Sequence, residues 1–169
     1  MNTMASRSMT DRMMGAARLD VSVYEEVEAD STATGQAAGV VAIVALCSAI
    51  GGIGGGAQGV FSGMIAALVG WAIWAGVTYL IGDKVLGGTA TWGELLRTLG
   101  FAQAPGVLFA LGVIPLIGGL ISIAVGLWIL VAGIVAIRQA LDFGTGRAIA
   151  TAILGFIPYV ILAAMLRPG

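Results

Sequence analysis

The chain has 169 residues, of which 59% are hydrophobic and only 10% are charged, and its mean hydropathy is +1.01. Soluble domains carry about 25% charged residues because their surfaces face water, so this composition excludes an ordinary soluble protein. The net charge of -1 provides no field that would attract nucleic acid, and we expect no nucleic-acid partner. Between residues 35 and 137 only four residues are charged, and all four fall between Asp83 and Arg97. These features predict an all-α, polytopic membrane helix bundle.

The first 34 residues are polar and are predicted to form a cytoplasmic N-terminal segment. From Met9 to Glu28 there is no proline and one interior glycine, and apolar residues recur at spacings of three and four. This pattern predicts one amphipathic, acidic helix on the membrane surface or against the bundle. The segment has no apolar signal-peptide core, so we expect the first apolar run to direct insertion.

Five apolar segments follow, and they predict a single transmembrane bundle over residues 35–167, with spans at about 35–53, 60–81, 101–114, 116–137 and 148–166. The third span is unusual, because 14 residues of α-helix would reach only about 21 Å across a hydrocarbon core of about 30 Å. It contains Pro105, and a capping-box pattern upstream, Thr91 to Glu94, predicts an interfacial helix from Trp92. We expect this helix to break near Gly100 and to continue as a short or kinked third span.

The basic residues favour a cytoplasmic N-terminus and five full crossings. The outer segments then hold Arg167 alone, whereas the cytoplasmic segments hold Arg7, Arg12, Arg18, Lys84, Arg97, Arg138 and Arg147. Lys and Arg accumulate on the cytoplasmic side of membrane proteins, so a ratio of seven to one supports this orientation. If the third segment did not cross, the ratio would fall to six to two.

Many of the 27 glycines recur at a spacing of four residues, which allows transmembrane helices to approach closely. Packing within the chain is the leading interpretation, and an oligomer interface or a flexible or pore-lining role are the alternatives. The candidate helix-packing positions are Gly35, Gly39, Gly59, Gly63 and Gly70. The aromatic residues Trp71, Trp74, Tyr79, Trp128 and Tyr159 fit interfacial belts or lipid contact.

Two further sets of residues are candidates for function. For the acidic residues 24–30 a solvated face that also marks the start of the first span is the leading interpretation, with a partner-docking site or a cation site as alternatives. Together with the 83–100 connection, the docking candidates are Tyr24, Glu25, Glu26, Glu28, Asp30, Lys84 and Arg97. In the broken third segment, Gln103 and Pro105 indicate a cavity or a kink, as does Pro158 in the last span. For Gln103 the leading interpretation is an interhelical hydrogen bond or a bond to the carbonyl freed by Pro105, and a substrate or ion contact is the alternative.

Catalytic, cofactor-binding and metal-binding motifs are absent from the sequence. The chain has no histidine and one cysteine, Cys47, and the predicted spans contain no charged residue. Histidine is the commonest general base and metal ligand, and charged residues at depth usually mark transport or relay sites. We therefore expect no enzymatic activity, no cofactor and no bound metal.

Three segments give the chain a resemblance to prokaryotic members of the Yip family: residues 17–30, 87–106 and 131–143. The resemblance implies a five-span fold, a cytosolic N-terminus and a prokaryotic cell membrane as the location. Eukaryotic members act in vesicle trafficking and associate with Rab-type GTPases and with one another, but their Asp-Leu-Tyr-Gly-Pro signature is absent here. The resemblance carries over no catalytic residue.

The leading hypothesis is a non-enzymatic integral membrane protein that acts through helix–helix and cytoplasmic contacts. It would serve as a membrane-organising, trafficking-like or accessory subunit in the lipid bilayer, within a homo-oligomer or a larger membrane complex. The alternative is a small-solute channel or transporter that uses the broken third helix.

Overall fold

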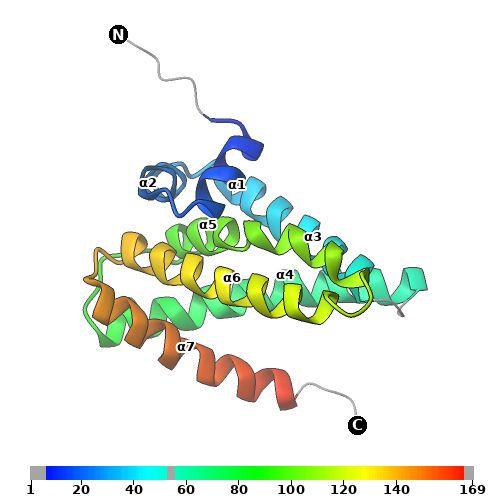
Figure 1. Cartoon of the computed structure of the whole chain (residues 1–169). Helices are drawn as coiled ribbons and strands as arrows, with labels where there is room; N and C mark the ends of the chain where they lie inside the picture. The colour runs from blue at the N-terminus through cyan, green and yellow to red at the C-terminus, as the bar shows by residue number, and fades with distance from the viewer. Residues whose placement is uncertain (1–6, 53–55, 166–169) are drawn as a thin grey trace.

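The computed structural model describes residues 7–52 and 56–165, and within them all side chains except those of 56–58, 156 and 158–165. The regular elements of this part are all helices, which confirms the predicted fold class (Figure 1). In chain order they are α1 (Met9–Ala17), α2 (Val21–Ala29), α3 (Ala33–Gly51), α4 (Gly56–Tyr79), the π-helical η1 (Leu80–Val85), α5 (Trp92–Ala102), the 3₁₀-helical η2 (Ala104–Val113), α6 (Gly118–Ala140) and α7 (Thr145–Met165).

Four helical segments of the described chain are long and apolar enough to cross a bilayer: Ala33–Gly51, Gly59–Val85, Trp92–Val113 and Gly118–Ala140. They correspond to the first four predicted spans, although the second continues through η1 to Val85 instead of ending at 81. The fifth predicted span falls on α7. Residue 166 and the side chain of Pro158 lie outside what the structure describes. The architecture is that of a helical membrane bundle.

The N-terminal segment folds as a pair of short helices, so the prediction of a single helix over Met9–Glu28 is wrong. Between α1 and α2, Leu19 adopts a φ of 62°, the left-handed conformation that closes a Schellman-type turn. Asp20 then caps α2 by accepting a hydrogen bond from the backbone amide of Ser22 at 3.0 Å. Glycine usually occupies the left-handed position, and because leucine occupies it here, the sequence pattern did not reveal the turn.

The third segment is broken, as predicted, but it is not short. The capping box is present, with reciprocal hydrogen bonds between Thr91 and Glu94, so α5 belongs to the segment. The α-helix ends at Ala102, close to the predicted break near Gly100, because Pro105 has no amide hydrogen to donate to an α-helical bond. With rises of about 1.5 Å per residue in α5 and 2.0 Å in η2, the segment reaches about 37 Å, enough for a hydrocarbon core of about 30 Å.

The third segment packs along α3, and the two run in the same direction. A Cβ atom added to Gly100 would lie 2.7 Å from the Cβ of Ala37, and one added to Gly106 would lie 2.5 Å from a methyl carbon of Val44. At the far end of α3, Gly51 lies directly against the backbone of η2. The positions 37, 44 and 51 are seven residues apart, about two helical turns, so they form one stripe on α3. This contact holds the first and third spans side by side.

Three of the glycines predicted to pack helices have open space beside them. No described atom lies within 4 Å of a Cβ added at Gly35, Gly59 or Gly63, and the atom closest to Gly39 is the terminal carbon of Met9 in α1, at 3.2 Å. The interpretation as helix packing within the chain is therefore wrong for Gly35, Gly59 and Gly63, whereas Gly39 does lie against a side chain of α1. Close approach depends on which residue lies opposite, and a spacing of four residues does not contain that information.

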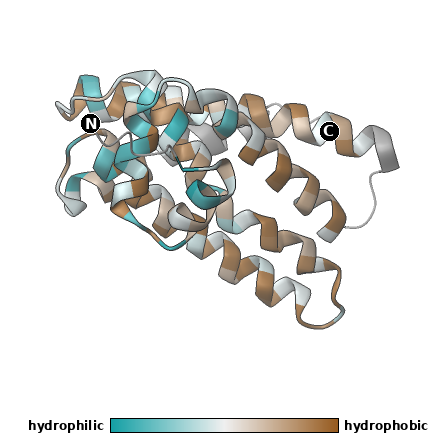
Figure 2. Cartoon of the chain, turned by 90° about the horizontal axis from the view of Figure 1, so that it is seen from above, coloured by the Kyte–Doolittle hydropathy of each residue, from teal (hydrophilic) through white to brown (hydrophobic). Residues whose placement is uncertain are grey.

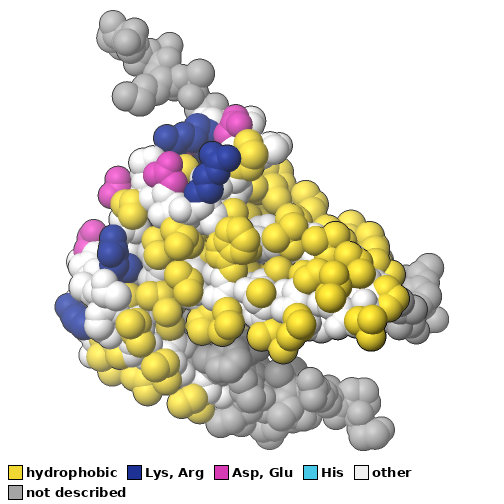
Figure 3. Space-filling model, in the orientation of Figure 1, with side chains coloured by type: hydrophobic (Ala, Val, Ile, Leu, Met, Phe, Trp, Pro, Cys, Tyr) yellow, Lys and Arg dark blue, Asp and Glu magenta, His cyan; other side chains and the backbone are white. Residues whose placement is uncertain are grey.

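Charged side chains gather at one end of the bundle, beside α1 and α2, and the visible remainder of the surface is largely hydrophobic (Figures 2 and 3). The segment after η1 and the α6–α7 connection meet at this polar end, where the Thr89 hydroxyl donates to the Asp142 carboxylate at 2.9 Å. There Leu141 also packs against Gly82 and Gly88. The molecule therefore has one polar end and an apolar body.

Candidate functional site

A cation from α5 holds the end of α2 against the bundle. Arg97 is only 8% exposed, and its guanidinium donates to the backbone carbonyls of Val27, at 2.9 Å, and Glu28. The last carbonyls of a helix have no partner inside it and carry partial negative charge. A buried guanidinium therefore satisfies both the hydrogen bonds and the charge of this helix end.

The end of α1 is capped in a similar way by an indole. Trp128 of α6 donates from Nε1 to the carbonyl of Ala17, the last residue of α1, at 2.8 Å. Tyr24 of α2 is fully buried and donates from its hydroxyl to the carbonyl of Ala16 at 3.0 Å, and burial raises the pKa of its phenol. These contacts fix α1 and α2 to each other and to the bundle through backbone atoms.

Arg12 of α1 organises the acidic residues. It is 1% exposed, and its guanidinium contacts the carboxylates of Glu26 at 2.9 Å and Asp30 at 2.7 Å. It also donates to the side-chain oxygen of Gln36 in α3 at 3.0 Å. Hydrogen bonds from Thr32 and from Arg12 hold the pKa of Asp30 below its usual value. The acceptors come from α2 and its C-cap and from α3, so Arg12 joins α1 to both helices. This structural role is separate from its contribution to the predicted membrane orientation.

The predicted docking residues therefore separate into internal and exposed groups. Tyr24 and Arg97 are buried, so their assignment to a partner-docking surface is wrong. Glu26 is paired with Arg7 and Arg12, and Asp30 with Arg12, so two arginines balance these two carboxylates. The exposed members are Glu25 and Lys84, the latter paired with Asp83 at 2.7 Å.

Glu28 occupies the seam between α2, α5 and the α6–α7 connection. Burial, reinforced by the carboxylates of Glu94 and Asp142, raises its pKa to about 7, and the nearby Arg97 only partly opposes this. A carboxyl group usually loses its proton well below neutral pH. Glu28 therefore changes its charge near neutral pH, within the contact that holds the N-terminal helices.

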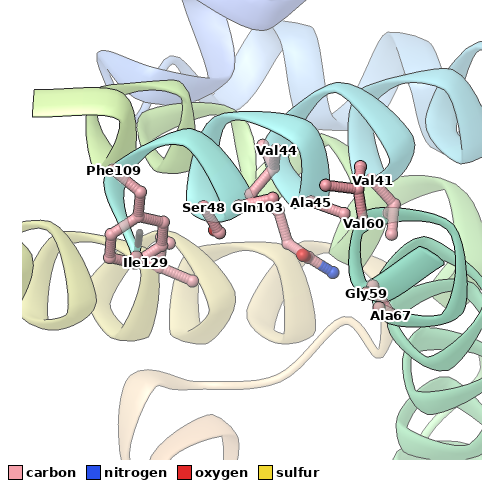
Figure 4. A pocket seen from close by; sticks show the side chains of 13 residues that line it. Val41, Val44, Ala45, Ser48, Gly59, Val60, Ala67, Gln103, Phe109 and Ile129 are labelled. Atoms are coloured by element: carbon pink, nitrogen blue, oxygen red, sulfur yellow. The ribbon is translucent and has the colours of Figure 1, made fainter. Parts of the chain in front are cut away.

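A groove of about 470 Å³ lies between α3 and α4, and the side chain of Gln103 points into it (Figure 4). The amide of Gln103 makes no hydrogen bond to a described residue, and Pro105 is buried in the helix break beside it. Gln103 also lines a larger hollow of about 750 Å³, as does Gly70. The walls of the α3–α4 groove are mostly small residues, among them Ala45, Ala49, Gly52, Gly59, Gly63 and Ala67.

Tryptophan side chains join helices, a role that the sequence did not indicate. Besides Trp128, the Nε1 of Trp71 donates to the carbonyl of Leu96 at 3.0 Å, and that of Trp92 to the carbonyl of Ala72 at 3.4 Å. Trp71 is 8% exposed, so the expected belt or lipid contact is wrong for this residue. The signal available in advance was that a buried tryptophan usually finds an acceptor for its N–H group, although Nε1 of Trp74 is buried without one among the described residues.

Replacing Arg97 by methionine should release the N-terminal helices. Two carbonyls would lose a charged donor, and such bonds contribute about 1.5–3 kcal/mol, so amide exchange in α2 should accelerate about 10- to 100-fold. Hydrogen–deuterium exchange in nanodiscs measures this effect. Arg18→Met, at an exposed arginine, is the control. Unchanged protection of α2 in Arg97→Met would contradict the assigned role.

The pKa of Glu28 predicts a loss of stability as the pH rises. The folded-state pKa of about 7 lies above the ordinary value of 4.5, so folding favours the protonated form. The stabilisation is complete below pH 4.5 and is lost as the pH passes through about 7. The melting temperature, followed by tryptophan fluorescence, should fall between pH 5 and pH 8 in the wild type and less in Glu28→Gln. Identical pH profiles would rule this explanation out.

The residues that carry these contacts lie within a known domain. Residues 22–166 match the model of the Yip1 domain, a range that runs from α2 to α7 and includes Arg97, Trp128 and both hollows. No curated protein and no solved structure gives a significant match. The match confirms the family suggested by the three sequence segments. With a helical membrane bundle and a Yip1 domain over most of its length, the chain belongs to the Yip family.

Proposed function

We propose that this protein is a non-enzymatic membrane-organising factor or accessory subunit that acts by associating with transmembrane helices. The observation that carries the proposal is the α3–α4 groove, because many of its lining residues are small and two of its glycines, Gly59 and Gly63, are open. Within the described chain nothing lies within 4 Å of a Cβ added at Gly59 or Gly63, and both residues are exposed.

Small residues on a lipid-facing surface favour association of helices. Apolar burial does not drive helices together in lipid, so association depends on close van der Waals contact, which glycine and alanine permit. The groove stays unfilled beside exposed apolar residues of α4, Phe61 and Ile65. A helix from a second copy of this chain, or from a larger membrane complex, is the occupant that we propose.

The polar end supplies the second contact of the proposal. Of the acidic segment, Glu25 is exposed, and Lys84 is exposed at the end of the second span. We propose that this end faces the cytoplasm of a prokaryotic cell, because the basic residues of the described chain gather there. A cysteine at position 25 in a Cys47→Ser background should react with an impermeant maleimide only after the cells are opened; labelling of intact cells would reverse the orientation.

Filling the groove should weaken association. Gly63→Leu places a branched side chain where a second helix would approach, and we expect a dissociation constant about tenfold higher, equivalent to about 1.4 kcal/mol. Single-molecule photobleaching in lipid vesicles of varied protein density measures this constant. Ile65→Leu, which keeps the volume at an exposed position on the same helix, is the control.

Two results would count against association as the function. One is a wild-type protein that stays monomeric at every density and carries no partner after mild solubilisation from its own cells. The other is an equal dissociation constant for Gly63→Leu and the wild type.

The side chain of Gln103 supports a second candidate, a small-solute channel or transporter. Its amide is a polar group without a hydrogen-bonding partner among the described residues, at a break in a membrane-spanning helix, and irregular backbone at depth often lines a solute path. Solute-driven swelling of proteoliposomes that is lost in Gln103→Leu would support this function. Equal swelling with and without protein would exclude it for the solutes tested.

A further inference from the structure

The end of the bundle opposite α1 and α2 has no charged residue in the described chain, and its exposed side chains are largely apolar (Figure 3). The last residues of α3 and η2 and the first residues of α6 meet there, because Gly51 and Gly118 both lie against the backbone of η2. Between Gln103 and Ser122 no residue has a polar side chain. We call this the apolar end; its exposed apolar residues include Ile50, Phe61, Leu116 and Leu120.

The turn at residues 114–117, which joins η2 to α6, has a leucine where a turn in water ordinarily has glycine or a polar residue. Leu116 is 100% exposed and adopts a left-handed backbone with a φ of 71°. That conformation disfavours leucine, and glycine, asparagine or aspartate usually occupies it. At the other end of α6 the exposed Asp142 does so, with a φ of 53°. The same helix therefore ends in a polar turn at the polar end and in an apolar turn at the apolar end.

The backbone amides of this apolar turn bond within the chain. Pro115 has no amide hydrogen, and the amides of Ile114, Ile117 and Gly118 donate to backbone carbonyls at 3.1, 2.9 and 2.9 Å. Within the described chain this leaves the amide of Leu116 as the donor of the turn without a protein acceptor. An unpaired backbone group costs little in water and several kcal/mol in lipid. A turn whose amides are paired in this way is suited to a position outside bulk water.

The helices are too short to carry the turn into the water beyond the membrane. A charge within the hydrocarbon core is costly, so Arg138 places the polar end of α6 at or outside the edge of that core. From Arg138 to Gly118 the helix rises about 30 Å, the thickness of the core itself. On α3, Gln36 accepts from the Arg12 guanidinium and lies only about 22 Å from Gly51. The headgroups add about 5–7 Å on each side, so the apolar turn ends at the boundary between acyl chains and headgroups.

We propose that the apolar turn is a lipid-binding surface, with Leu116 in contact with the acyl chains of the leaflet farther from the polar end. Acyl chains accommodate an exposed leucine that is unfavourable in water, and the surface continues the apolar body of the bundle, which spans the membrane. The contact requires no charge on the lipid, so it selects no headgroup. The α3–α4 groove plays no part in it, so this proposal and the proposed association are tested separately.

A fluorescent label on the turn tests its depth. In a Cys47→Ser background, Leu116→Cys or, as the control, Glu25→Cys is labelled with an environment-sensitive maleimide. The full chain is then placed in phosphatidylcholine nanodiscs, whose two faces are both open to solutes. Lipids with a nitroxide near the headgroup end of the acyl chain should quench the label at Leu116→Cys. Iodide in the buffer should quench that label much less than the label at the exposed position 25.

Two other patterns of quenching would overturn the proposal. Equal quenching by iodide at Leu116→Cys and Glu25→Cys would place the turn in water. Protection of Leu116→Cys from both iodide and the nitroxide lipids would show that a protein, and not lipid, covers the turn.

Replacing Leu116 by asparagine gives a second test, whose sign depends on the solvent. The leucine side chain is fully exposed, so its replacement removes no packing within the chain. Asparagine adopts the left-handed backbone more readily, so in water Leu116→Asn would raise the melting temperature. In lipid the asparagine amide would lose its hydrogen bonds to water, so the melting temperature in nanodiscs should fall below that of the wild type. Leu116→Met, which stays apolar, should match the wild type. An equal or higher melting temperature for Leu116→Asn would overturn the proposal.

Discussion

The guanidinium of Arg97, buried against the carbonyl end of α2, is the contact on which the N-terminal part of the structure depends. It joins residues 70 positions apart in the chain. A donor from α5, within the bundle, thereby bonds the carbonyl end of α2, which lies outside the spans. Trp128 does the same for α1, and Arg12 ties both helices to α3. The pair of helices α1 and α2 is therefore not a loose amphipathic segment at the membrane surface but a part of the folded bundle.

The body of the bundle depends on the contact between α3 and the third segment. Because Gly100, Gly106 and Gly51 have no side chains, two parallel spans approach until backbone and methyl groups touch. After Gln103 the third segment rises about 2.0 Å per residue as a 3₁₀ helix, against about 1.5 Å in α3. It therefore follows α3 over the same length with fewer residues. At the same break the side chain of Gln103 points into the α3–α4 groove. The break in the third segment therefore also places a polar amide inside the bundle.

The sequence predicts well what depends on local chemistry. Long apolar runs, the capping box at Thr91 and the helix-breaking proline are all read from neighbouring residues, and the structure contains each of them. The turn at Leu19 escaped prediction because an unfavourable residue occupies a left-handed position that tertiary contacts stabilise. The roles of Arg12 and Arg97 also escaped, since their partners lie on other helices and sequence spacing does not show which residues face one another.

The attachment of α1 and α2 to the bundle has a mechanical consequence. Along the chain, α2 is followed almost at once by α3, yet the end of α2 is bonded to α5 in the middle of the sequence. A force applied to the N-terminus would therefore be shared between the first and third spans instead of unravelling the first span alone. A molecule that pulled on the N-terminal end would load the third span, which contains the helix break and lines the open groove.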